Sequence, residues 1–143
     1  MPYVKLWINA VWGTKSRYPY LKGEIKTKVI KHIKENSRRV KIYIDTINGH
    51  DDHLHCLFGL NTTMSVSKAL NLIKGESSFW VNKNHISKST FEWCDEYYAV
   101  SVSESDLQRV RNYINNQEEH HRKKTFQEKV DDFIKEHPAK GQG

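Results

Sequence analysis

The chain has 143 residues, enough for one domain that buries its own core without disulfide or metal support. Hydrophobic residues make up 37% and charged residues 28%, as in soluble globular domains, and no apolar run reaches the ~20 residues that span a bilayer. The net charge of +6, with a pI of about 9.3, mildly favours a polyanionic partner. Cys56 and Cys94 form no CxxC pair and the start carries no signal peptide, so we expect a cytoplasmic protein without a disulfide framework.

The first half of the chain predicts a strand, a helix and a hairpin. Alternating apolar residues predict a strand from Tyr3 to Trp12. Apolar residues at helical spacing then predict a helix from about Leu21 to Arg38. A second strand follows over residues 40–45. The segment 48–52, which contains Asn-Gly, is a strong turn signal, and a third strand from His53 to Leu60 completes the hairpin.

The second half predicts one more strand among helices. The segment 61–63, Asn-Thr-Thr, is expected to cap a helix from about Ser65 to Asn82. A fourth strand is predicted from about Tyr97 to Val102, then a helix from about Glu104 to Lys123 and a short helix from Phe126 to Glu136.

The order β-α-β-β-α-β predicts an α+β, ferredoxin-like split βαβ fold with an antiparallel sheet and C-terminal helices. Because this fold hosts many functions, it does not decide between them. Few prolines and glycines interrupt the chain, so we expect a single domain over residues 1–137 and a flexible tail over residues 138–143.

A histidine pair is the first candidate site. His53 and His55 lie two apart on a predicted strand, so both side chains share one face and Leu54 points to the other. Two neighbouring imidazoles can hold one metal ion. Two alternatives stay open: a pair of unrelated surface histidines, and a zinc site that adds His50 and Cys56, although no second half with matching spacing is present.

A tyrosine on a predicted helix is the second candidate. Tyr113 and Gln117 stand at positions i and i+4, so they share one face, and His121 extends the same stripe. A phenol beside an amide suits a nucleophile next to a metal ligand. The alternative is a partly buried tyrosine on an ordinary amphipathic helix.

In this order, the two motifs resemble the single-tyrosine HUH transposases of insertion sequences that move as single-stranded DNA, including their palindrome-associated relatives. The HUH motif corresponds to His53-Leu54-His55 and the tyrosine motif to the segment from Tyr113 to Gln117. The resemblance covers most of the chain and extends to the stretches VWGTKSRYPYL, LNLIKGESSFWVN and FEWCDEYYAVSVS.

The resemblance implies that Tyr113 attacks a phosphate of single-stranded DNA and leaves a 5′-phosphotyrosine and a free 3′-hydroxyl. It also implies that His53, His55 and Gln117 bind a divalent metal ion, Mg²⁺ or Mn²⁺. Imidazole ligands by themselves favour Mn²⁺ over Mg²⁺. From the residues alone, His120 and His121 compete with Gln117 for the third ligand position.

Five basic residues are candidates for DNA binding, because each Lys or Arg on a phosphate strengthens salt-dependent binding: Lys15, Arg17, Lys74, Arg122 and Lys123. The resemblance implies a substrate with hairpins at the element ends. Because no apolar run is long enough to span a bilayer, we expect no membrane partner. The resemblance also implies a homodimer in which the tyrosine helix of one subunit completes the metal site of the other.

Other functions remain open beside this one. Replication and plasmid-nicking HUH endonucleases are usually larger, and a two-histidine phosphoesterase needs a second His-x-Ser/Thr motif, which the chain lacks. A non-catalytic ferredoxin-like module that binds nucleic acid through exposed aromatic residues is an alternative. So is a domesticated nickase that cuts DNA without moving an element.

Overall fold

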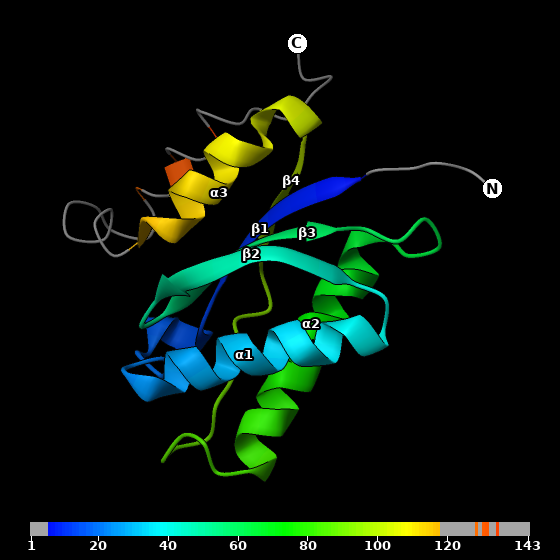
Figure 1. Cartoon of the computed structure of the whole chain (residues 1–143). Helices are drawn as coiled ribbons and strands as arrows, with labels where there is room; N and C mark the ends of the chain where they lie inside the picture. The colour runs from blue at the N-terminus through cyan, green and yellow to red at the C-terminus, as the bar shows by residue number, and fades with distance from the viewer. Residues whose placement is uncertain (1–5, 118–127, 129, 132–133, 135–143) are drawn as a thin grey trace.

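A computed structural model describes residues 6–117 and positions 128, 130, 131 and 134 (Figure 1). Within this part of the chain the elements are β1 (Trp7–Gly13), the 3-10 turn η1 (Lys15–Arg17), α1 (Glu24–Arg39), β2 (Tyr43–His50), β3 (His53–Gly59), α2 (Val66–Lys83), β4 (Tyr98–Val102), the 3-10 turn η2 (Glu104–Asp106) and α3 (Leu107–Asn115). The strands form an antiparallel sheet in the order β2-β3-β1-β4. The predicted split βαβ fold is confirmed.

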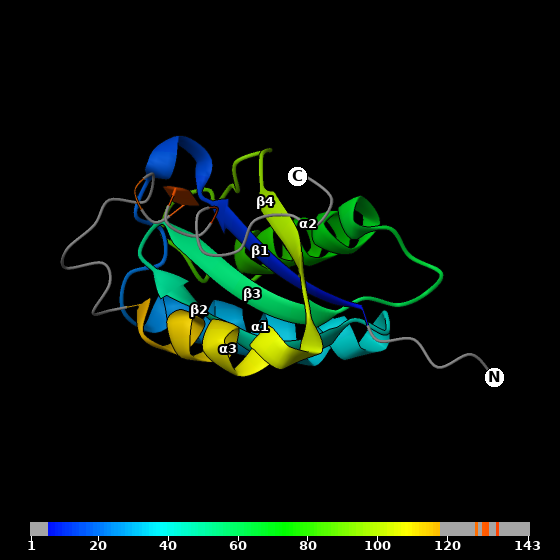
Figure 2. The same cartoon turned by 90° about the horizontal axis from the view of Figure 1, so that it is seen from above.

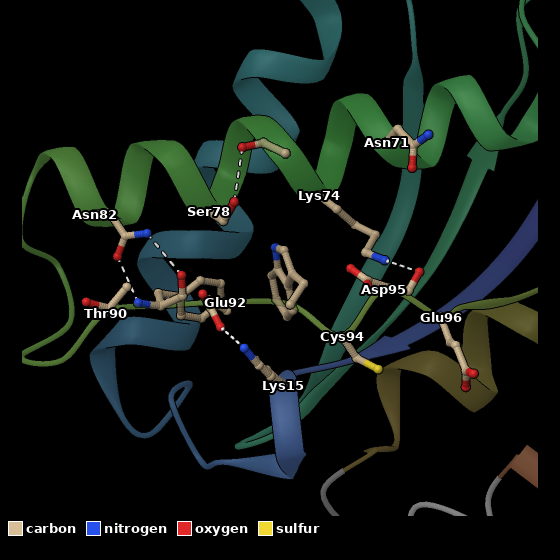
Figure 3. A pocket seen from close by; sticks show the side chains of 13 residues that line it. Lys15, Asn71, Lys74, Ser78, Asn82, Thr90, Glu92, Cys94, Asp95 and Glu96 are labelled. Atoms are coloured by element: carbon tan, nitrogen blue, oxygen red, sulfur yellow. Dashed lines mark hydrogen bonds and ion pairs between the residues drawn. The ribbon is translucent and has the colours of Figure 1, made fainter.

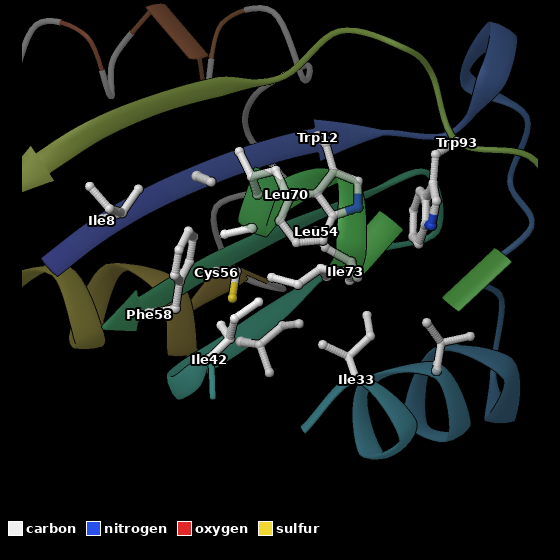
Figure 4. Packing of buried hydrophobic residues seen from close by; sticks show 14 of the residues in the cluster. Ile8, Trp12, Ile33, Ile42, Leu54, Cys56, Phe58, Leu70, Ile73 and Trp93 are labelled. Atoms are coloured by element: carbon white, nitrogen blue, oxygen red, sulfur yellow. The ribbon is translucent and has the colours of Figure 1, made fainter. Parts of the chain in front are cut away.

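The sheet separates two unequal layers (Figures 1 and 2). Helices α1 and α2 cover one face, and α3 lies across the other. Between the sheet and α1 and α2 is the main core (Figure 4), whose largest members include Trp12, Leu54, Phe58 and Leu70. A smaller apolar cluster holds α3 and consists of Leu57, Val102, Leu107, Val110 and Ile114.

Strand β2 starts later than predicted and contains a bulge. Val40 and Lys41 lie in the turn after α1, where Lys41 has a φ of 61°. The pairing with β3 shifts register between Ile44 and Thr46, so Asp45 is an extra residue in the strand. A bulge of this kind reverses the alternation of side chains, which lets Ile47 return to the core face after Ile44.

The predicted turn over residues 48–52 is wrong for residues 48–50, which continue β2. Only Asp51 and Asp52 form the turn, and His50 pairs directly with His53 at the end of the hairpin. The hairpin is therefore longer than the Asn-Gly signal indicated.

The cap of α2 also differs from the prediction. The residue that caps the helix is Ser65, whose Oγ accepts a hydrogen bond of 3.1 Å from the backbone N–H of Lys68. Asn61, at the start of the predicted cap, instead accepts a hydrogen bond from the backbone N–H of Thr63 within a preceding turn. An Asn-Thr-Thr segment has the right chemistry for a cap but stands one turn too early.

The remaining predicted helix ends either differ from the observed ones or lie outside the described residues. Helix α1 begins at Glu24 rather than near Leu21, which is buried ahead of the helix. The predicted helix over residues 104–123 begins as a 3-10 turn, and α3 ends at Asn115. The predicted last helix and the tail over residues 138–143 lie largely outside the described residues, although positions 128, 130, 131 and 134 are helical. Among the described helices, none has the length and apolar character needed to cross a bilayer.

Candidate active site

Strand β3 places His53 and His55 side by side on the face of the sheet that α3 covers. Both side chains are completely buried, and their ring centroids lie 5.2 Å apart. Leu54, between them, belongs to the main core on the other face. The predicted alternation is confirmed, and the pair forms a polar site beneath α3.

The structure separates Cys56 from this pair. Cys56 packs in the main core, on the opposite face of the sheet, where burial raises the pKa of its thiol. His50 lies across the hairpin from His53. However, the described residues contain no group of three or more His, Cys, Asp or Glu side chains that could hold a metal ion. The alternative zinc site with Cys56 is therefore wrong.

Asp52 supports His53 from the hairpin turn. One carboxylate oxygen lies 2.7 Å from His53 Nδ1, and the other accepts a hydrogen bond of 3.2 Å from Arg17 Nη2. Burial alone would raise the pKa of Asp52, but hydrogen bonding and charge attraction from His53 and Arg17 outweigh it and lower this pKa to about 2. When His53 is neutral, the ionised carboxylate holds its one ring proton on Nδ1, which leaves Nε2 as the nitrogen suited to bind a metal ion.

Helix α3 brings Tyr113 to the histidine pair. The Tyr113 ring centroid lies 5.7 Å from that of His55, at an angle of 71° between the rings. Gln117 is completely buried, and its side-chain amide donates a hydrogen bond of 3.0 Å to the backbone oxygen of Tyr113. The two motifs therefore meet within one chain, on one face of the sheet. His120 and His121 lie outside the described residues.

Two polar contacts fix α3 over strand β2. Arg111 donates two hydrogen bonds to the carboxylate of Asp45, at 2.8 and 2.9 Å. Asn48 donates to the backbone oxygen of Asn115 at 3.4 Å. The hydrogen bonds from Arg111 lower the pKa of Asp45 despite its partial burial. No spacing rule in the sequence connects these residues, because their contact depends on the bulge in β2.

The structure describes three of the five predicted DNA-binding residues, and these three lie at two separate sites. Lys15 and Lys74 line a groove of about 880 Å³ between α2 and the segment 90–96 (Figure 3), where Lys15 forms an ion pair with Glu92. Lys74 is only 8% exposed and donates a hydrogen bond of 3.1 Å to the backbone oxygen of Asp95. Arg17 instead lies beside Asp52, next to the histidine pair. Arg122 and Lys123 lie outside the described residues.

Comparison with known proteins shows which family the chain belongs to. The model of the family described as "Transposase IS200 like" matches residues 2–117, which include the histidine pair and the tyrosine motif. The chain belongs to this family. No curated protein gives a significant match.

Two solved structures share the fold of this IS200-like transposase. One is a proposed transposase from Deinococcus radiodurans R1, with a TM-score of 0.65 and 22% identity, covering 82% of this chain and 95% of its own. The other is a REP-associated tyrosine transposase bound to a REP hairpin. It has a TM-score of 0.60 and 17% identity, and the match covers 85% of this chain and 72% of its own.

Proposed function

We propose that this transposase cleaves and rejoins single-stranded DNA through a covalent 5′-phosphotyrosine on Tyr113. The observation that supports this most directly is that Tyr113 lies against His55, whose ring is 5.2 Å from that of His53, on a single buried face. A non-catalytic nucleic-acid-binding module has no need for a phenol beside two buried imidazoles.

In the proposed step, the Tyr113 hydroxyl loses its proton and its oxygen forms a bond to the scissile phosphorus. The bond between phosphorus and the 3′-oxygen breaks, and the leaving oxygen takes up a proton as a 3′-hydroxyl. The phosphotyrosine keeps the energy of the phosphodiester, so attack by a 3′-hydroxyl reseals the strand without ATP. Helix α3 contributes by positioning the phenol, since its contacts with β2 fix the helix over the sheet.

The residues present fit a divalent metal ion. His53 and His55 supply adjacent imidazoles and Asp52 fixes the tautomer of His53. Gln117 is buried and its amide nitrogen donates to the backbone of Tyr113, so we propose its side-chain oxygen as the third donor. We propose that these three side chains hold Mg²⁺ or Mn²⁺. When bound, such an ion polarises the phosphoryl oxygen and stabilises charge on the leaving oxygen.

We further propose a substrate with hairpins at the element ends. The structural relative that carries a REP hairpin supports this class of DNA. Lys15 and Lys74 in the groove and Arg17 beside the site are the proposed phosphate contacts among the described residues, with Arg122 and Lys123 beyond them. Each lost phosphate contact should reduce the slope of log K against log [salt] by about 1.

The test uses single-stranded oligonucleotides that tile the DNA flanking the gene, incubated with Mn²⁺ and run on a denaturing gel. We expect a covalent adduct with the wild-type protein, and none with Tyr113→Phe or with His53→Ala combined with His55→Ala. Tyr43→Phe, which changes an exposed tyrosine on β2, is the matched control and should form the adduct normally. An adduct that persists in Tyr113→Phe rejects the assignment of the nucleophile.

Homodimerisation with exchange of the tyrosine helix is a separate proposal, because the two motifs also meet within one chain here. Mixing Tyr113→Phe protein with the His53→Ala, His55→Ala protein tests it. In an exchanged dimer, one mixed site keeps both its tyrosine and its histidines, so activity returns to a fraction of the wild-type level. If sites form within one chain, the mixture stays inactive.

A further inference from the structure

A second hollow lies beside the histidine pair, on the β1 and β4 side. It has a volume of about 310 Å³, and its walls include Val11, Gly13, Arg17, Glu96, Tyr97 and Tyr98. We name it the Tyr98 pocket. A volume near 300 Å³ with aromatic walls and a few polar groups is typical of small-ligand sites.

Strand register fixes the position of the pocket relative to the active site. Val11 pairs with His55 on one side and with Tyr98 on the other, so all three side chains share a face. Neighbouring strands lie ~4.8 Å apart, which puts the backbone of Tyr98 roughly 10 Å from that of His55. Gly13 likewise pairs with His53. The pocket therefore lies on the same face as the histidine pair, with only β1 between them.

We infer that the Tyr98 pocket binds one unpaired nucleobase of the DNA strand, next to the scissile phosphate. The position of that phosphate rests on the proposed function; the chemistry of the pocket does not. The flat ring of Tyr98 offers a face for stacking, which tolerates any base, whereas Lys74 Nζ lies over the ring of Tyr97, 5.6 Å from its centroid. Burial raises the pKa of Tyr98, so its hydroxyl stays protonated and can donate a hydrogen bond to a base.

The charges around the pocket favour a base inside it and a phosphate at its edge. Glu96 repels a phosphate but accepts hydrogen bonds from the amino group of a cytosine or adenine. Arg17 stands on the side toward Asp52 and the histidine pair. A guanidinium carries five N–H donors, so Arg17 can hold Asp52 and also donate to a phosphate oxygen.

The backbone beside the pocket is shaped to place Arg17. Ser16 and Arg17 have φ values of 55° and 58°, a left-handed conformation that non-glycine residues rarely adopt and that clusters at functional sites. Gly13 lies next to this side chain: a Cβ there would be in ordinary contact with Arg17 Cδ, at 3.6 Å, and would be tight only against the backbone oxygen of Asp52, at 3.3 Å. The loop after β1 thus holds a cation between the pocket and the metal-binding pair.

Photo-crosslinking tests the inference without relying on cleavage. Full-length Tyr113→Phe protein is irradiated with a single-stranded oligonucleotide of thymidines that carries one 5-iododeoxyuridine, and the crosslinked peptide is mapped by mass spectrometry. We expect a crosslink to Tyr97 or Tyr98, which moves or disappears in Tyr98→Ala. Crosslinks confined to other residues in a protein that binds the oligonucleotide would overturn the inference.

Cleavage kinetics then separate the two proposals. An abasic nucleotide beside the cut should slow single-turnover cleavage by the wild type by about 5- to 150-fold, the range measured for one base–aromatic stack. In Tyr98→Ala the same abasic nucleotide should have little further effect, and Tyr98→Phe, which keeps the ring, should behave like the wild type. Equal abasic effects in the wild type and Tyr98→Ala reject the pocket and leave the phosphotyrosine proposal intact. Failure of all cleavage, with the crosslink preserved, rejects the proposed function instead.

Discussion

The two faces of the sheet differ in the polarity of the side chains that they bury. On the α1 and α2 face, fully buried side chains such as Leu54 and Phe58 are apolar and belong to a large cluster. On the α3 face, His53, His55 and Asn9 are as completely buried, but they are polar. The side-chain amide of Asn9 has no hydrogen-bond partner among the described residues, an arrangement that costs free energy. Stability therefore comes mainly from one face, and the other holds the buried polar residues of the proposed site.

The largest effect that tests this comparison is the change in unfolding free energy expected from a matched pair of leucine substitutions. Leu54 lies in the main core, and Leu107 lies in the small cluster under α3. We expect Leu54→Ala to lower the free energy of unfolding by about 4–5 kcal/mol and Leu107→Ala by about 2 kcal/mol, because a small cluster relaxes more easily around a lost side chain. Urea unfolding measures both. An equal or larger loss for Leu107→Ala would mean that the α3 face carries as much of the stability.

The next largest expected effect is on Mn²⁺ affinity, through the contact of Asp52 with His53. Asp52→Asn removes the charge that fixes the tautomer of His53, so Mn²⁺ affinity should fall about 10- to 100-fold. Electron paramagnetic resonance of free Mn²⁺ measures the affinity. Asp51→Asn, at the neighbouring position in the same turn, is the control and should bind Mn²⁺ like the wild type. If both variants bind alike, Asp52 has no special role in the site.

The contact between Arg111 and Asp45 predicts a dependence on pH. The pKa of Asp45 is lowered in the folded protein, so its ionised form stabilises the fold above the ordinary pKa of ~3.9, and this stabilisation is lost as the pH falls through the lowered value. Wild type should therefore exceed Asp45→Asn in unfolding free energy at pH 6, with the difference shrinking below pH ~4. Asp106→Asn breaks an exposed pair with Arg109 and should show a smaller difference at every pH. A difference for Asp45→Asn that does not change with pH excludes this ion pair as its source.

The smallest predicted effect concerns the cap of α2. Ser65→Ala removes the acceptor for the Lys68 N–H and should cost about 1 kcal/mol of stability. Thr62→Ala, in the exposed segment where the sequence predicted the cap, should stay within about 0.5 kcal/mol of the wild type. Thermal unfolding distinguishes the two, and the reverse order would show that the predicted cap was correct.

Local patterns predicted those parts of the structure that depend on a few neighbouring residues. His53 and His55 share a face because side chains alternate along any strand. Tyr113 and Gln117 share a face because residues four positions apart lie on one side of a helix. The contact of Arg111 with Asp45 could not be predicted, because it joins residues 66 positions apart and depends on a bulge. The cap was predicted one turn too early because Asn61 and Ser65 are equally suitable chemically, and the local pattern does not distinguish the two positions.

Mapping the covalent adduct tests the central claim most directly. Trypsin cleavage after Arg111 and Arg122 releases the peptide 112–122, in which Tyr113 is the only tyrosine. After nuclease digestion of the trapped complex, mass spectrometry should find this peptide heavier by one nucleotide phosphate, attached to Tyr113 through the 5′ position. An adduct on any other residue, or cleavage of the DNA without a protein-linked phosphate, would contradict the account.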